Sequence, residues 1–182
     1  MITTQEASSA LQEAATTERR SAQAYSYSRS APFLILWGVI WIAGYGGTAV
    51  LPGQQASWLW IALSVVGTGI SIWLGSTQAK ARDSSGWRVG ALVAIIFAFV
   101  FALFSILPPT NELQAGAISP LLLSAIYAAM GLWRGLRFVL LGAFLVVITL
   151  GAYFFLKEFF FVWMALAGGG SLLLTGLWMR HG

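Results

Sequence analysis

Long apolar runs alternate with short polar connections along most of the chain. A hydrocarbon core of about 30 Å is crossed by around 20 mostly apolar residues in a helix. Six runs without a charged residue reach or approach that length. They predict an all-α integral membrane protein built as a bundle of six transmembrane helices, over Phe33–Leu51, Ser57–Gly75, Val89–Leu107, Gly116–Trp133, Phe138–Leu156 and Phe159–Met179.

The fourth run carries the weakest signal of the six. It is among the shortest, and Pro120 is expected in its first turn. A proline is well tolerated there, because the first N–H groups of a helix have no partner inside the helix. We therefore keep this run as a crossing.

The polar segment 1–31 precedes the six-helix domain, which is expected over residues 32–180. Thr3 and Glu6 fit a capping box, and the residues that follow at helical spacing are mostly alanine, so a partly helical tail is expected. Two interpretations stay open: a docking or dimerisation surface, or a tail that only fixes orientation. The first apolar run after it is too long for a cleaved signal sequence and is expected to remain as an anchor.

The basic residues predict the orientation of the bundle, because cytoplasmic loops collect lysine and arginine. With six crossings and both termini in the cytoplasm, nine of the ten basic residues fall on the cytoplasmic side and only Lys157 on the other. We expect these nine to set the topology and to contact lipid headgroups: Arg19, Arg20, Arg29, Lys80, Arg82, Arg88, Arg134, Arg137 and Arg180. Short loops and this charge bias are typical of a bacterial inner membrane, the plasma membrane of the cell.

Composition supports a membrane protein and removes most chemistry. Hydrophobic residues make up 58% of the chain and charged residues 9%, against roughly 25% charged in a soluble domain. The net charge of +4 is explained by topology, so no nucleic-acid partner is expected. The chain has no cysteine and one histidine, His181, and none of the six runs holds a charged residue. Intramembrane catalysis and ion relays rely on such groups. We expect no enzyme, no cofactor and no metal site.

Small residues recur every four positions on several of the predicted helices, including Gly67, Ser71 and Gly75 on the second and Ala167, Ser171 and Thr175 on the sixth. Such faces let helix backbones approach closely. Gly168, Gly169 and Gly170 form the most unusual local feature. Two interpretations stay open for them: a close helix crossing, or an unwound segment whose carbonyl groups face a substrate or ion.

A weak internal similarity relates the second and sixth helices. Trp60-Ile61-Ala62-Leu63 is followed by Gly67, as Trp163-Met164-Ala165-Leu166 is followed by Gly170. Duplication of a helical hairpin and convergence on common membrane sequence patterns both account for it. The first explanation favours three helical hairpins as the plan of the bundle.

Two functions are compatible with these features. The leading hypothesis is a non-enzymatic component that senses, scaffolds or regulates, with the bilayer around it and a protein partner bound through the N-terminal tail. The alternative is a passive channel or facilitator for a small neutral or apolar solute, formed by one chain or by a homo-oligomer. The missing reactive groups favour the first, and the glycine clusters favour the second.

Overall fold

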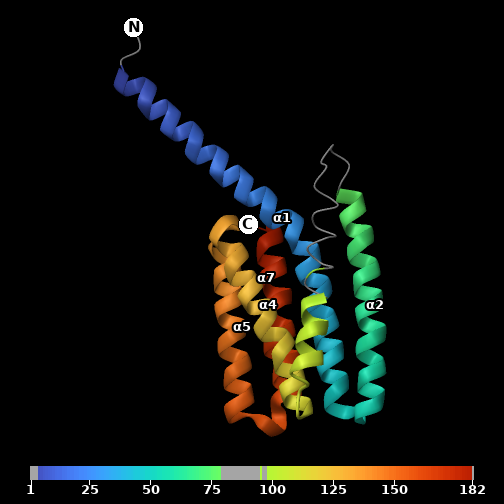
Figure 1. Ribbon diagram of the computed structural model, residues 1–182. Coiled ribbons are helices and arrows are strands. Elements are labelled where there is room, and N and C mark those ends of the chain that lie inside the picture. The colour runs from blue at the N-terminus through green and yellow to red at the C-terminus, as the bar shows by residue number, and fades with distance from the viewer. Residues whose placement is uncertain (1–3, 79–94, 96–97, 182) are drawn as a thin grey trace.

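The computed structural model describes residues 4–78, 95 and 98–181, and every regular element in this part of the chain is a helix. The long elements are α1 (Thr4–Val50), α2 (Gly53–Gln78), α4 (Glu112–Arg134) and α5 (Leu136–Phe155). The last pass begins with the 3-10 turn η1 (Lys157–Phe159) and continues through α6 (Phe160–Trp163), the π-helix η2 (Met164–Gly169) and α7 (Gly170–His181). These passes stand side by side in one bundle (Figure 1).

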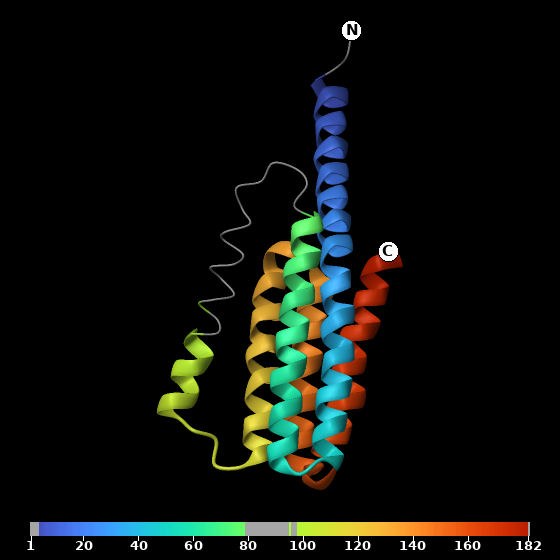
Figure 2. The same ribbon diagram turned by 90° about the vertical axis from the view of Figure 1, so that its right-hand side faces the viewer.

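Five of the helical passes are long and apolar enough to cross a membrane. They cover Leu11–Val50, Gly53–Thr77, Glu112–Arg134, Leu136–Phe155 and Lys157–Arg180. This confirms an all-helical chain with several membrane-length helices. Much of the predicted third crossing, Val89–Leu107, lies outside the described residues, and the structure gives a short helix at 98–106 (Figure 2).

The first helix is far longer than its apolar run. It begins at Thr4 and passes without a break through the predicted boundary at residues 31 and 32, so that Pro32 lies inside it. A proline within a helix removes one hydrogen bond and crowds the carbonyl group four residues earlier, which bends the helix. Figure 1 shows α1 changing direction where it enters the bundle. Ala31 is already buried there, at 1% exposure.

The fourth predicted helix begins one turn earlier than the sequence analysis expected, so Pro120 lies inside α4 and not in its first turn. The cap explains the difference. Asn111 Oδ1 accepts a hydrogen bond from the Gln114 backbone N–H at 2.8 Å, and Gln114 Oε1 accepts bonds from the Thr110 N–H and hydroxyl group. Glu112 in the first turn also suits the positive end of the helix dipole.

The most extensive packing joins α4 to α5 and α1 to α7. The second pair joins the first helix to the last pass, in which η2 also packs on α1, and glycines lie where these backbones meet. A Cβ atom on Gly169 would lie 3.0 Å from the Gly38 carbonyl oxygen, and one on Gly38 would lie 3.0 Å from that of Gly169. Glycines let these backbones touch, which replaces the hydrophobic drive that lipid cannot supply.

Large apolar side chains fill the interior of the described bundle. Phe138, Leu145, Phe160, Met164 and Leu172 are each no more than 1% exposed. No buried polar side-chain atom among the described residues lacks a hydrogen-bond partner. The buried Thr149 hydroxyl, for example, lies 3.8 Å from the sulfur atom of Met164.

Candidate functional site at the basic end of the bundle

One end of the bundle collects most of the described basic residues. There α1 leaves the bundle, α4 ends at Arg134, α5 begins at Leu136 and α7 ends (Figure 1). Arg134, Arg137 and Arg180 lie on these helix ends, and Arg29 lies on α1 nearby. The turn η1 at the opposite end carries Lys157 beside Glu158. Lys80, Arg82 and Arg88 fall outside the described residues.

Arg137 joins three helices at this end. Its guanidinium carbon lies 4.9 Å from the ring centre of Tyr27 on α1 and 4.4 Å from that of Trp178 on α7. Its Nη1 also donates a hydrogen bond of 3.1 Å to the Trp178 carbonyl oxygen. A cation suits this position, because the carbonyl groups at the C-terminal end of α7 carry partial negative charge.

Tyr27 seals the junction between α1 and the α4–α5 turn. Its ring is buried and lies 5.9 Å from that of Phe138, centre to centre. The turn itself depends on Gly135, whose φ of 123° and ψ of 163° are adopted almost only by glycine. A Cβ atom on Gly135 would collide with the Tyr27 hydroxyl group.

The part of α1 before this junction is an arm that projects from the bundle (Figure 1). We call residues 4–25 the arm. Its described side chains, including Leu11 at 72%, Glu13, Glu18 and Arg20, are all exposed. Arg19 lies on the arm as well. At the base of the arm, Arg29 donates a hydrogen bond to the Tyr25 hydroxyl group and lies over the Tyr25 ring.

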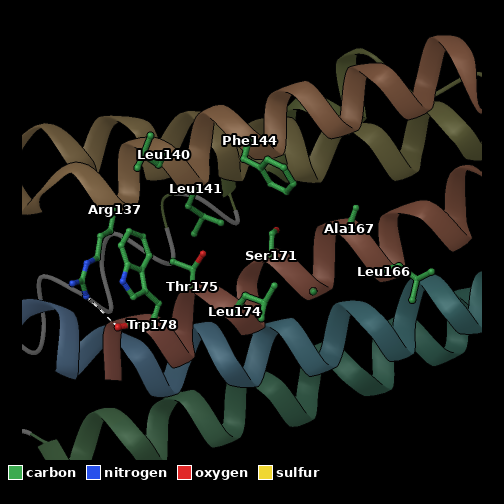
Figure 3. Close-up of a pocket in the computed structure, with 11 residues that line it drawn as sticks. Arg137, Leu140, Leu141, Phe144, Leu166, Ala167, Ser171, Leu174, Thr175 and Trp178 are labelled. Carbon is green, nitrogen blue, oxygen red and sulfur yellow. Dashed lines mark hydrogen bonds between the residues drawn. The ribbon is translucent and has the colours of Figure 1, made fainter. Parts of the chain in front are cut away.

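A groove of about 370 Å³ runs between α5 and the last pass, beginning at Arg137 and Trp178 (Figure 3). Leu140, Leu141 and Phe144 line it from α5. The other wall is formed by Leu166, Ala167, Gly170, Ser171, Leu174 and Thr175. It is therefore an apolar groove along the outside of the bundle, with one cationic side chain, Arg137, at its end and the hydroxyl groups of Ser171 and Thr175 on its wall.

The three consecutive glycines have separate surroundings. A Cβ atom on Gly168 would meet the Trp41 ring at 3.4 Å, one on Gly169 would meet the backbone of α1, and one on Gly170 would meet nothing within 4 Å. Gly168 and Gly169 end the π-helix and Gly170 begins α7, so the segment is helical and not unwound. Trp41 itself is buried there, at 3% exposure.

The small face of α2 is only partly used in the described part of the chain. Gly67 lies against Ile40 and Trp37 of α1, and the Ser71 hydroxyl accepts a hydrogen bond of 3.3 Å from the Trp37 indole N–H. A Cβ atom on Gly75 would meet nothing within 4 Å. The predicted face of Ala167, Ser171 and Thr175 borders the groove.

Two residues of this end were not singled out as site residues by the sequence analysis. Tyr27 and Trp178 hold the Arg137 guanidinium group between their rings. No sequence pattern around Tyr27 or Trp178 predicts their contact with Arg137, because that contact depends on how α1 and α7 pack against α5.

Among the described residues, no group of three or more histidine, cysteine, aspartate or glutamate side chains is placed to hold a metal ion. The chain matches no protein-family model, no curated protein and no solved structure.

Proposed function

We propose that this chain is a non-enzymatic, multi-pass component of a bacterial inner membrane that docks a protein partner on its cytoplasmic helical arm. The observation that carries the proposal is the continuity of α1 from the arm into the bundle. A partner bound to the arm would thus be held by the same helix that packs on α7. Signals or positional constraints can pass along such a helix, which suits a sensing, scaffolding or regulatory role.

The chemistry of the arm supports a protein as its partner. Ala14, Ala15 and Leu11 recur at helical spacing and are exposed, while Glu13, Glu18 and Arg20 supply charges of both signs. A narrow stripe of small residues with mixed charges around it fits a second helix at close distance. An anionic lipid surface would be served better by a uniformly basic face.

The positions of the helix ends support the proposed topology. The arm, Arg134, Arg137 and Arg180 share one end of the bundle, as expected if that end faces the cytoplasm. Helix α2 ends at this end and α4 begins at the opposite one (Figure 1). A further crossing between them, as the sequence predicts, gives six crossings and places both termini in the cytoplasm.

Packing favours docking over the alternative of a passive channel. Within the described bundle the interior is filled by large apolar side chains, and Gly168 and Gly169 pack against Trp41 and α1. Two of the three consecutive glycines that suggested a pore are thus engaged in helix contacts, and the third, Gly170, borders the groove on the outside of the bundle.

The test is affinity purification of the full-length protein in mild detergent beside a variant that lacks residues 1–22. This deletion removes most of the arm but retains Tyr27 and its contacts with Arg137, so the thermal stability of the bundle should not change. We expect one defined protein to bind the full chain, and to bind it again when both are purified and mixed, but not to bind the shortened chain.

Two results would overturn the proposal. One is a partner that binds both chains equally. The other is movement of a solute or ion by the purified protein alone in liposomes, which would support the channel.

A further inference from the structure

We propose that the groove between α5 and α7 binds an anionic phospholipid, with its phosphate group at Arg137 and one acyl chain along the apolar wall. The site is independent of the arm. A lipid here would lie between two helices of the bundle and would act as a structural or regulatory ligand.

The length of the groove fits one leaflet. Its wall extends from Leu166 to Trp178, which are twelve residue steps apart along the last pass. At 1.5 Å per residue this is about 18 Å. The hydrocarbon core of a bilayer is about 30 Å thick, so one leaflet contributes about 15 Å. The groove therefore has room for one extended acyl chain beginning at the headgroup level.

The apolar part of the groove is suited to such a chain. Leu140, Phe144, Leu166 and Leu174 border it and are each at least 49% exposed, while Leu141 is buried. Phe144 points into the groove from α5 in Figure 3. The Ser171 hydroxyl group donates to the Gly168 carbonyl oxygen at 2.7 Å, so this polar group on the wall has its donor satisfied within its own helix.

The charge at the end of the groove favours an anion. A guanidinium group has five N–H donors. One donor group of Arg137, Nη1, bonds to the Trp178 carbonyl oxygen, and the two flanking rings fix the plane of the guanidinium. The described carboxylates lie on the arm (Glu13, Glu18) or near the opposite end of the bundle (Glu112, Glu158). Phosphate is a preferred partner of a pre-oriented arginine.

The test uses native mass spectrometry of the purified protein with phosphatidylglycerol and phosphatidylcholine of identical acyl chains. We expect phosphatidylglycerol to bind preferentially with one lipid per chain. Arg137→Gln should reduce that preference about tenfold, which corresponds to about 1.4 kcal/mol. Arg134→Gln is the matched control, because Arg134 lies on the same end and does not line the groove. Equal losses in the two variants would mean general charge attraction and would overturn the site.

A second variant tests the groove without disturbing Arg137. Gly170→Leu places a side chain in the groove, and its Cβ atom meets nothing within 4 Å, so the fold should be retained. Gly151→Leu is its control, because Gly151 is equally open and lies away from the groove. We expect lipid binding to be lost only in Gly170→Leu. Retained binding would overturn the proposal, and so would a dimer of the chain that disappears in Gly170→Leu, which would identify a second copy as the occupant.

Discussion

The Tyr45 hydroxyl group on α1 donates a hydrogen bond of 2.7 Å to the Gly116 carbonyl oxygen on α4. In an α-helix that carbonyl group would accept from the residue four positions later, which is Pro120 and has no N–H. The buried tyrosine therefore satisfies an acceptor that the proline leaves open. An intrahelical defect in one segment is repaired by a side chain 71 positions earlier in the sequence.

This relationship predicts the outcome of a double-mutant cycle. Tyr45→Phe leaves the Gly116 carbonyl group without its donor in an apolar environment, which should lower the free energy of unfolding by about 1–3 kcal/mol. Pro120→Ala restores a backbone N–H at position 120, so Tyr45→Phe should cost clearly less in that background. Unfolding in detergent, followed by circular dichroism, measures all four proteins. An equal loss of unfolding free energy on Tyr45→Phe in both backgrounds would contradict the idea that Tyr45 compensates for the N–H group that Pro120 lacks.

Substitution by alanine should destabilise the protein at Gly169 but not at the adjacent Gly170. Gly169→Ala places a methyl group 2.6 Å from Ile42 Cγ1 and 2.9 Å from the Ile42 backbone nitrogen. Overpacking of this kind costs about 1–3 kcal/mol. Gly170→Ala meets open space and should leave the melting temperature unchanged or raise it. A melting temperature that falls equally in both variants would argue against the close crossing of α1 and η2.

The α4–α5 turn should not tolerate a side chain at Gly135. In Gly135→Ala, alanine must adopt a backbone conformation that costs residues other than glycine about 1–3 kcal/mol. The added methyl group must also displace the Tyr27 hydroxyl group. Besides a lower melting temperature, we expect faster amide hydrogen exchange in α1 near Tyr27. Gly151→Ala on α5 is the control for loss of a glycine. Unchanged amide exchange near Tyr27 would contradict the prediction that the α4–α5 turn stabilises this part of α1.

Much of the helical plan is predictable from hydropathy because each crossing must be long and apolar, and the structure confirms five such helices. The start of α4 was missed, although Asn111 and Gln114 carry a capping signal. The long arm of α1 was not predictable from apolar runs, because its residues are polar and alanine-rich. The sequence did not predict which glycines pack against another helix, or that Arg137 lies between Tyr27 and Trp178. Both depend on which distant helices are neighbours, and periodicity within one segment does not carry that information.

The proposed topology can be tested by labelling, since the chain contains no cysteine. Single cysteines replace Leu11 on the arm, Gln54 at the start of α2, and Arg180 near the end of α7. A membrane-impermeant maleimide added to spheroplasts of a bacterial host should label position 54 only. After lysis all three should react. Labelling of position 11 before lysis would reverse the orientation, and opposite behaviour of positions 11 and 180 would exclude six crossings.

The most direct test of the docking proposal is photocrosslinking in living cells. A photoreactive amino acid is placed at Leu11, which is 72% exposed on the arm, and as a control at Gln54 at the other end of the bundle. The account predicts a single defined protein adduct from position 11 and none of the same mass from position 54. No protein adduct at position 11, or the same adduct from both positions, would contradict a partner docked on the arm.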